Sequence, residues 1–241
     1  VLGGLDDGVD TDGNIVIFEG NSVTDFHYNT SRTTTSNAIS SGHQNVGATT
    51  LSSELTIRNN TFYDVDHAVL LKDFSFATIE NNTIVKATVG GIQFQELTGS
   101  SVIGPGQGAV LDGNIFAETP LVFEAIHATT QLTVNRSIVT PDLVALGTGN
   151  LSADPLLADP ANGDFQLTEG SPAFLTGPNG TDIGAIQAER YAPASVENIQ
   201  ITEFHYNPVA GSQIDPLCEV AADGDWFEFI ELMTVAFRNR T

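Results

Sequence analysis

The sequence predicts an all-β protein: a right-handed parallel β-helix (solenoid) of about five to six coils, followed by a short, incomplete β-sandwich segment of the immunoglobulin type. Two recurring patterns predict the solenoid. An asparagine returns in similar settings along the chain, and a small residue followed by a branched one lies a little upstream of each asparagine. Helical periodicity is poor throughout, which favours strands.

Composition sets the first limits on function. The chain has 241 residues, of which 41% are hydrophobic, enough to bury a core. Its 30 acidic and 8 basic residues give a formal net charge of −22. This charge repels nucleic acid and anionic membranes, so neither is an expected partner. Cys218 is the only cysteine, which excludes an intrachain disulfide, and no apolar run is long enough for a membrane span. Because no Met or signal-like segment opens the sequence, we expect a fragment of a longer chain.

The asparagine positions are separated by 39, 22, 32 and 21 residues. The two long intervals contain Gly/Ser/Thr-rich insertions at 30–45 and 99–108, which are expected to be loops. Equivalent residues of a solenoid lie above one another at the strand spacing of about 4.8 Å. We therefore predict a structural ladder in which each amide donates to the asparagine one coil away. Its members are Asn21, Asn60, Asn82, Asn114 and Asn135.

Two tetrads, NNTF and NNTI, also permit another interpretation. Asn59 and Asn81 each begin an N-x-T triplet, the acceptor pattern for glycosylation. Such triplets are frequent in a chain rich in Asn, Ser and Thr, so composition explains most of them. Asparagine also tolerates the left-handed backbone of a tight turn between two sheets, which favours the structural role.

Each repeat unit is predicted to hold two short strands. Alternation in LTIRNNTF and ATIENNTI places Leu55, Ile57, Ala77 and Ile79 on the inward face. The second recurring pattern marks another strand in each unit, at Val9, Ile39, Val69, Ile92 and Val122.

The segment from 154 to 187, DPLLADPANGDFQLTEGSPAFLTGPNGTDIGAIQ, resembles the closing segment of bacterial right-handed parallel β-helix proteins of the pectate-lyase-like type. Gln187 stands where that family usually has Glu. The resemblance implies a β-helix domain over 1–187. The first 100 residues are similar, more loosely, to β-helical segments beside CotH-type kinase and lamin-tail modules. None of the kinase's own residues is present, so none of its catalysis is expected.

Residues 188–197 are predicted to be a linker. Beyond it, NIQITEFHYNP (198–208) and DWFEFIEL (225–232) resemble the start of a bacterial lamin-tail domain. A sandwich of that type needs roughly 100 residues, so 198–241 is expected to be a truncated or frameshifted copy. These resemblances imply an exported bacterial protein, extracellular or at the cell surface. The implied partners are polysaccharide, cell-surface components and other domains of the same parent chain.

The strongest candidate for a ligand site is the acidic stretch DDGVDTDGN. Carboxylates interleaved with glycine supply the oxygen ligands that Ca²⁺ prefers, so Asp7, Asp10 and Asp12 are candidate calcium ligands. Alternate residues of a strand share one face, which would bring Asp10 and Asp12 together. The alternative is a solvated acidic turn.

The sequence gives weaker evidence for a catalytic site than for a calcium site. A polysaccharide lyase needs a Lys or Arg base beside a cation, but no basic stripe forms on stacked coils, and Arg58 is expected to pair with Glu80 one coil away. A glycoside hydrolase needs two facing carboxylates, which 30 acidic residues cannot single out. We therefore predict a non-catalytic scaffold or recognition segment that binds carbohydrate. The alternatives are a lyase or hydrolase acting in a groove, and structural packing within an adhesin.

Overall fold

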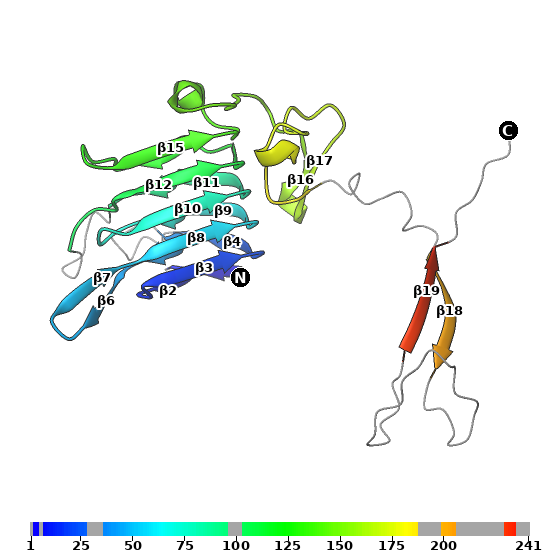
Figure 1. Cartoon of the computed structure of the whole chain (residues 1–241). Coiled ribbons are helices and arrows are strands. Elements are labelled where there is room, and N and C mark those ends of the chain that lie inside the picture. The colour runs from blue at the N-terminus through cyan, green and yellow to red at the C-terminus, as the bar shows by residue number, and fades with distance from the viewer. Residues whose placement is uncertain are drawn as a thin grey trace, which may run out of the picture. The chain divides into compact units, whose positions relative to one another are not determined.

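The computed structural model describes residues 2–4, 7–27, 36–95, 103–187, 199–205 and 229–234, with the backbone alone at 2–3, 199–205 and 229–234. The chain divides into two compact units, Val1–Ala188 and Glu189–Thr241. The first unit consists mainly of short strands stacked in parallel (Figure 1). The prediction of an all-β protein with parallel sheets is confirmed.

Two parallel sheets form the first unit, and the chain visits them alternately. The five-stranded sheet contains, in spatial order, β15 (Gln131–Asn135), β12 (Gly108–Asp112), β10 (Phe76–Glu80), β8 (Glu54–Arg58) and β3 (Ile15–Glu19). The eight-stranded sheet follows the order β1 (Leu2–Gly4), β4 (Ser22–Phe26), β9 (Thr61–Leu70), β11 (Thr83–Gln93) and β13 (Ile115–Ala117), with β2 (Val9–Thr11), β5 (Asn37–Ser41) and β14 (Phe123–Glu124) paired alongside.

The core consists of apolar side chains that stack in rows from strand to strand. Ile57 pairs with Ile79, which pairs with Leu111, and all three are at most 1% exposed. Leu55 and Ala77 form a second buried row, so the predicted inward residues are confirmed. In the other sheet the predicted register is right for four positions, Val9, Ile39, Val69 and Ile92. At the last position it is wrong by one residue, because Phe123 rather than Val122 pairs with Ile92.

A left-handed residue followed by a polar one marks four passages from the five-stranded to the eight-stranded sheet, and the same pairing recurs twice beyond β15. The left-handed backbone (φ between 42° and 72°) places the next side chain in the interior, where it hydrogen-bonds to the adjacent turns. The pairs are Gly20–Asn21, Asn59–Asn60, Asn81–Asn82, Gly113–Asn114, Arg136–Ser137 and Gly149–Asn150.

Hydrogen bonds join four of the five predicted ladder asparagines. The backbone and side-chain amides of Asn60 both donate to Asn82 Oδ1, at 3.0 and 2.9 Å. Asn82 donates in the same way to Asn114 Oδ1, at 2.9 and 3.0 Å. Asn21 donates to Asn60 Oδ1 at 2.8 and 3.2 Å. Asn60, Asn82 and Asn114 are fully buried, so these bonds satisfy polar groups that water cannot reach.

The expectation for Asn135 is corrected. Asn135 ends β15 beside Asp112, two residues before the ladder position, because here the asparagine precedes the left-handed residue. Its Oδ1 accepts instead from Thr148, at 3.0 Å from the backbone nitrogen. Ser137 takes the ladder position: its Oγ accepts from Asn114 N at 3.0 Å, and its own nitrogen donates to Asn150 Oδ1 at 3.1 Å.

Residues 154–187 pack on the outside of the eight-stranded sheet. Ala173 and Ile183 form a second buried cluster with Ile115 and Ile138, and the Phe165 ring meets Tyr63 edge-on at 6.4 Å. Gln187 closes a turn by donating to two backbone oxygens and accepting from Asp182 N. The elements here are β16 (Leu157–Asp159) and β17 (Asp164–Leu167), which pair antiparallel, with η2 (Pro160–Asn162) and η3 (Pro178–Gly180). The preceding η1 (Pro141–Leu146) packs through Leu143 and Val144 on the main core instead.

Two further strand pairs are antiparallel. β6 (His43–Val46) and β7 (Thr49–Ser52) form a hairpin inserted between β5 and β8, which projects from the stacked strands (Figure 1). In the second unit, β18 (Ile199–His205) pairs with β19 (Phe229–Thr234). These strands hold parts of the two lamin-tail-like motifs. The predicted linker at 188–197, Cys218 and the remainder of 198–241 lie outside the described residues.

Candidate functional site

A row of charged side chains follows the bend in the middle of the eight-stranded sheet. The register of the flanking residues places Asp25 beside Asp64 and Asp64 beside Lys86. Glu118 directly follows Ala117, the partner of Val85, and so continues the row just beyond β13. All four have a left-handed backbone, with φ of 65°, 54°, 59° and 51°. This conformation is uncommon outside glycine, and here it recurs on successive passes of the chain. We call these four residues the corner row.

His27 lies between two carboxylates next to the corner row. Its Nε2 is 3.0 Å from Asp64 Oδ1 and its Nδ1 is 3.0 Å from Asp66 Oδ1. Asp66 Oδ1 also accepts from Thr88 Oγ1 at 3.0 Å. Partial burial opposes protonation of His27, but the hydrogen bond to Asp66 and the charges of both carboxylates outweigh it and raise the pKa of the imidazole. The imidazolium form therefore fits this site best.

Lys86 is held by the same network. Its Nζ lies 2.8 Å from Asp64 Oδ2 and 5.7 Å from the centre of the Tyr63 ring. The hydrogen bond from Lys86 to Asp64 raises the pKa of the amine, and the charge of Glu118 adds to the shift. Lys86 is thus fixed in its charged form, in which it cannot accept a proton.

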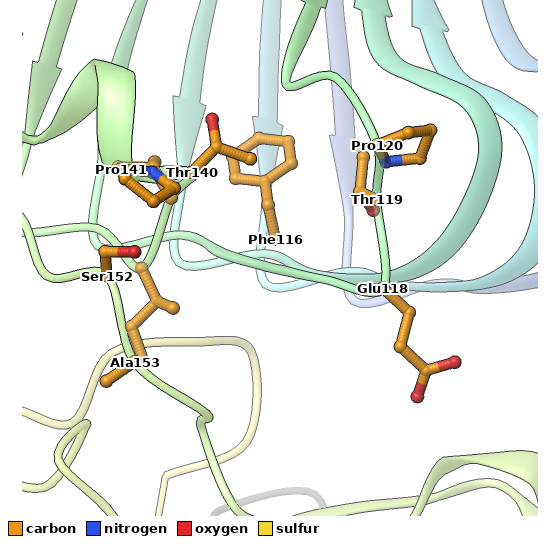
Figure 2. A pocket seen from close by; sticks show the side chains of 10 residues that line it. Phe116, Glu118, Thr119, Pro120, Thr140, Pro141, Ser152 and Ala153 are labelled. Atoms are coloured by element: carbon orange, nitrogen blue, oxygen red, sulfur yellow. The ribbon is translucent and has the colours of Figure 1, made fainter.

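The corner row ends at an open cavity of about 520 Å³. Figure 2 shows Thr119 and Pro120 on one side of it, and Thr140, Pro141 and Ser152 on the other, with the Phe116 ring between. Glu118 is the only ionisable side chain of the lining. The cavity therefore combines hydroxyl groups, an apolar floor and one carboxylate.

A second histidine is buried away from the corner row. His67 is fully buried, its Nε2 is hydrogen-bonded to Glu124 Oε2, and its Nδ1 has no hydrogen-bond partner. Gly90 lies beside this pair: an added Cβ there would be 3.4 Å from both side chains, an ordinary packing contact. Burial lowers the pKa of His67 despite the neighbouring carboxylate. His67 is therefore neutral in the folded protein near neutral pH.

The two histidines predict opposite pH dependences of stability. The folded-state pKa of His27 is raised above 6.5, so its contribution is complete below pH 6.5 and is lost as the pH rises through the folded pKa. The folded-state pKa of His67 is lowered, so stability falls as the pH drops from 6.5 towards that value. Urea denaturation from pH 5 to 8 should show His27→Gln most destabilising at low pH and His67→Gln most destabilising at high pH. Equal slopes for both variants would contradict this assignment.

The predicted calcium ligands do not converge in the structure. Asp7 Oδ1 accepts from Asn37 Nδ2 at 2.8 Å, and burial raises the pKa of this carboxyl group. Asp10 and Asp12 are exposed, and Asp12 lies against Gly42 at the foot of the hairpin. Among the described residues, no group of three or more His, Cys, Asp or Glu side chains could hold a metal ion. Asp6 and parts of both insertions, 30–35 and 99–102, lie outside that range.

Arg58 and Arg136, like Lys86, are held in ion pairs with acidic side chains. Arg58 is in register with Glu80 but pairs with Glu19, with 2.9 Å between Nη2 and Oε2, so the expected partner is corrected. The hydrogen bond to Glu19 raises the pKa of Arg58. Arg136 binds Asp112 through two nitrogens. Arg32 lies outside the described residues.

Stacked parallel strands joined by an internal polar ladder define the chain's first unit as a parallel β-solenoid. A family model described as "Right handed beta helix region" matches residues 6–135. The match covers more than half of the 241 residues, so the chain belongs to the right-handed β-helix family. Comparisons with curated proteins and with solved structures gave no significant match. Within the described residues, no helix is long and apolar enough to cross a membrane.

Proposed function

We propose that the chain is a non-catalytic recognition segment of a larger exported bacterial protein, and that it binds carbohydrate at the corner row and the adjoining cavity. The observation that carries the proposal is the cavity of about 520 Å³ at the end of the corner row. Its size lies within the range of small-molecule sites, roughly 300–1,000 Å³. The regular row of side chains beside it suits a polymer that extends along the stacked strands.

The lining of the cavity matches the two faces of a sugar ring. A sugar presents C–H groups, which pack on apolar surfaces, and hydroxyl groups, which need hydrogen-bond partners. Phe116, Pro120 and Pro141 supply apolar contacts, while Thr140 and Ser152 supply hydroxyls. Glu118 adds an acceptor at one side (Figure 2).

The protonation of the basic residues favours carbohydrate binding over lyase chemistry. A base that removes a proton from a sugar must itself be unprotonated, which requires a lowered pKa. Lys86 and Arg58 have the opposite shift, because each is held by a carboxylate. Hydrolysis by paired carboxylates remains the alternative, since Asp64 and Asp66 flank His27.

The finer architecture belongs to the same proposal. We infer a solenoid of about five to six coils, closed by residues 154–187 and followed by a truncated lamin-tail domain. The antiparallel pair β18–β19 supports that second domain. An extracellular or cell-surface location, with other domains of the parent chain as neighbours, follows from the resemblance to exported proteins. Because calcium remains a candidate ligand, carbohydrate binding is measured both with and without Ca²⁺.

The test is a glycan array with and without Ca²⁺, followed by calorimetry on the best ligand. Thr140→Val keeps the shape of the side chain and removes a hydroxyl from the cavity, so binding should weaken roughly 3- to 10-fold, the value of one hydrogen bond. Thr133→Val removes an exposed hydroxyl from β15 outside the cavity lining and should leave binding unchanged.

Two results would overturn the proposal. Binding to no glycan, with or without Ca²⁺, would remove the carbohydrate function. Release of shortened or unsaturated products from a bound polysaccharide would replace recognition by catalysis, and loss of that release in Asp64→Asn or Asp66→Asn would then identify the carboxylates responsible.

A further inference from the structure

The β6–β7 hairpin exposes strand edges that no other described strand covers. β6 and β7 pair only with each other in the described part of the chain. Residues 44–50 are all exposed, including Val46 at 54%. Each outer edge therefore presents backbone N–H and C=O groups to solvent, which is a template for pairing with another strand.

The foot of the hairpin is fixed to the solenoid. His43 Nδ1 lies 2.8 Å from Oδ2 of the buried Asp73, on the next pass of the chain. Ser53 Oγ donates to Gly42 O at 2.9 Å on the other side of the foot. Within the hairpin, Thr50 Oγ1 donates to Asn45 Oδ1 at 2.8 Å. The edges are thus held in place before any partner arrives, which lowers the entropy cost of pairing.

Charge distinguishes the hairpin from the rest of the molecule. Its sequence, HQNVGATTLS, contains no Asp, Glu, Lys or Arg, whereas the chain carries a formal net charge of −22. Protein edge strands are commonly protected by lysine, proline or inward-pointing charges, and this hairpin has none of them. Two copies of so acidic a chain repel each other, and the repulsion is least where neither contributes a local charge.

We propose that this hairpin is a self-association surface, at which the outer edge of β6 pairs antiparallel with the same edge of a second copy. An antiparallel edge is complementary to itself about a twofold axis, so such a contact closes as a dimer. Val46 of β6 favours it, since an exposed β-branched side chain packs well against a facing strand. The surface is separate from the corner row, so the proposal does not depend on carbohydrate binding.

Sedimentation velocity of the whole chain over a range of concentrations tests the proposal. The wild type should form dimers, and the dimer should strengthen as salt is raised from about 0.05 to 0.5 M, because salt screens the repulsion between acidic surfaces. Val46→Lys places like charges near the contact and should weaken dimerisation at least tenfold. Circular dichroism verifies that the variant is folded.

Ile126→Lys is the matched control. Ile126 is 53% exposed, close to the 54% of Val46, and the substitution changes the net charge equally. It should leave the dimer unchanged or slightly stronger. A wild type that stays monomeric at high concentration and high salt would overturn the proposal, as would a dimer that Val46→Lys leaves intact or that both variants weaken equally.

Discussion

Asn82→Ala is expected to lower the free energy of unfolding by about 3–5 kcal/mol, measured by urea denaturation at pH 7. The substitution removes the acceptor of Asn60 N and Nδ2 and the donor to Ile57 O. These groups are buried, and each one left unpaired costs about 1–3 kcal/mol. The loss is large because water cannot replace the missing side chain in the tightly packed interior.

Asn59→Gly is the control, because Asn59 is the left-handed residue that precedes ladder residue Asn60, as Asn81 precedes Asn82. Asn59 is exposed and has a φ of 56°, which glycine adopts without strain. Stability should therefore change by less than about 1 kcal/mol. If the two variants were equally destabilising, the distinction between a left-handed turn residue and a buried ladder residue would be wrong.

The asparagine repeat was predictable because one physical role selects one residue. Asn60, Asn82 and Asn114 each use donors and an acceptor in the same buried place, and a short side-chain amide offers two N–H donors beside its oxygen, where a serine hydroxyl offers one donor. The prediction failed at Asn135 because Ser137, two residues later, accepts the hydrogen bond from Asn114 N. Residue type alone does not show which of the residues 135–137 points inward.

The sequence analysis did not predict the corner row, although its residues have a regular spacing in the sequence. Asp25, Asp64, Lys86 and Glu118 each stand four residues after a ladder asparagine. Their identities differ, so a search for repeated letters passes over them. The shared property is a left-handed backbone at the bend, which emerges only when the strands stack in register. Position relative to the ladder, rather than residue type, was the available signal.

The calcium prediction treated nearness in sequence as nearness in space. Asp7 enters the interior, where Asn37 holds it, whereas Asp10 lies exposed on β2. Charged groups brought together from distant passes form the stronger network: His27, Asp64 and Asp66 are up to 39 residues apart. Such pairs depend on coil lengths, and the insertions made those lengths uncertain from the sequence.

Gly108→Ala is the second change with a large expected effect. A Cβ at this position would lie 2.0 Å from the carbonyl oxygen of Gln131 and within 2.9 Å of two more of its backbone atoms. Backbone atoms of a paired strand cannot move aside singly, so β12 and β15 would have to separate. We expect a loss of at least about 3 kcal/mol in the free energy of unfolding, measured by thermal and urea denaturation.

Gly20→Ala separates this clash from the general cost of replacing a glycine. Gly20 has a φ of 68° with no atom within 4 Å of an added Cβ, so the variant should lose only about 1–2 kcal/mol. The two variants should also differ in function. β15 leads directly into Val139 and Thr140 of the cavity lining, so displacing it should weaken carbohydrate binding in Gly108→Ala and spare it in Gly20→Ala. Equal binding by both, with stability lost in only one, would show that the cavity does not depend on the stacking of β12 and β15.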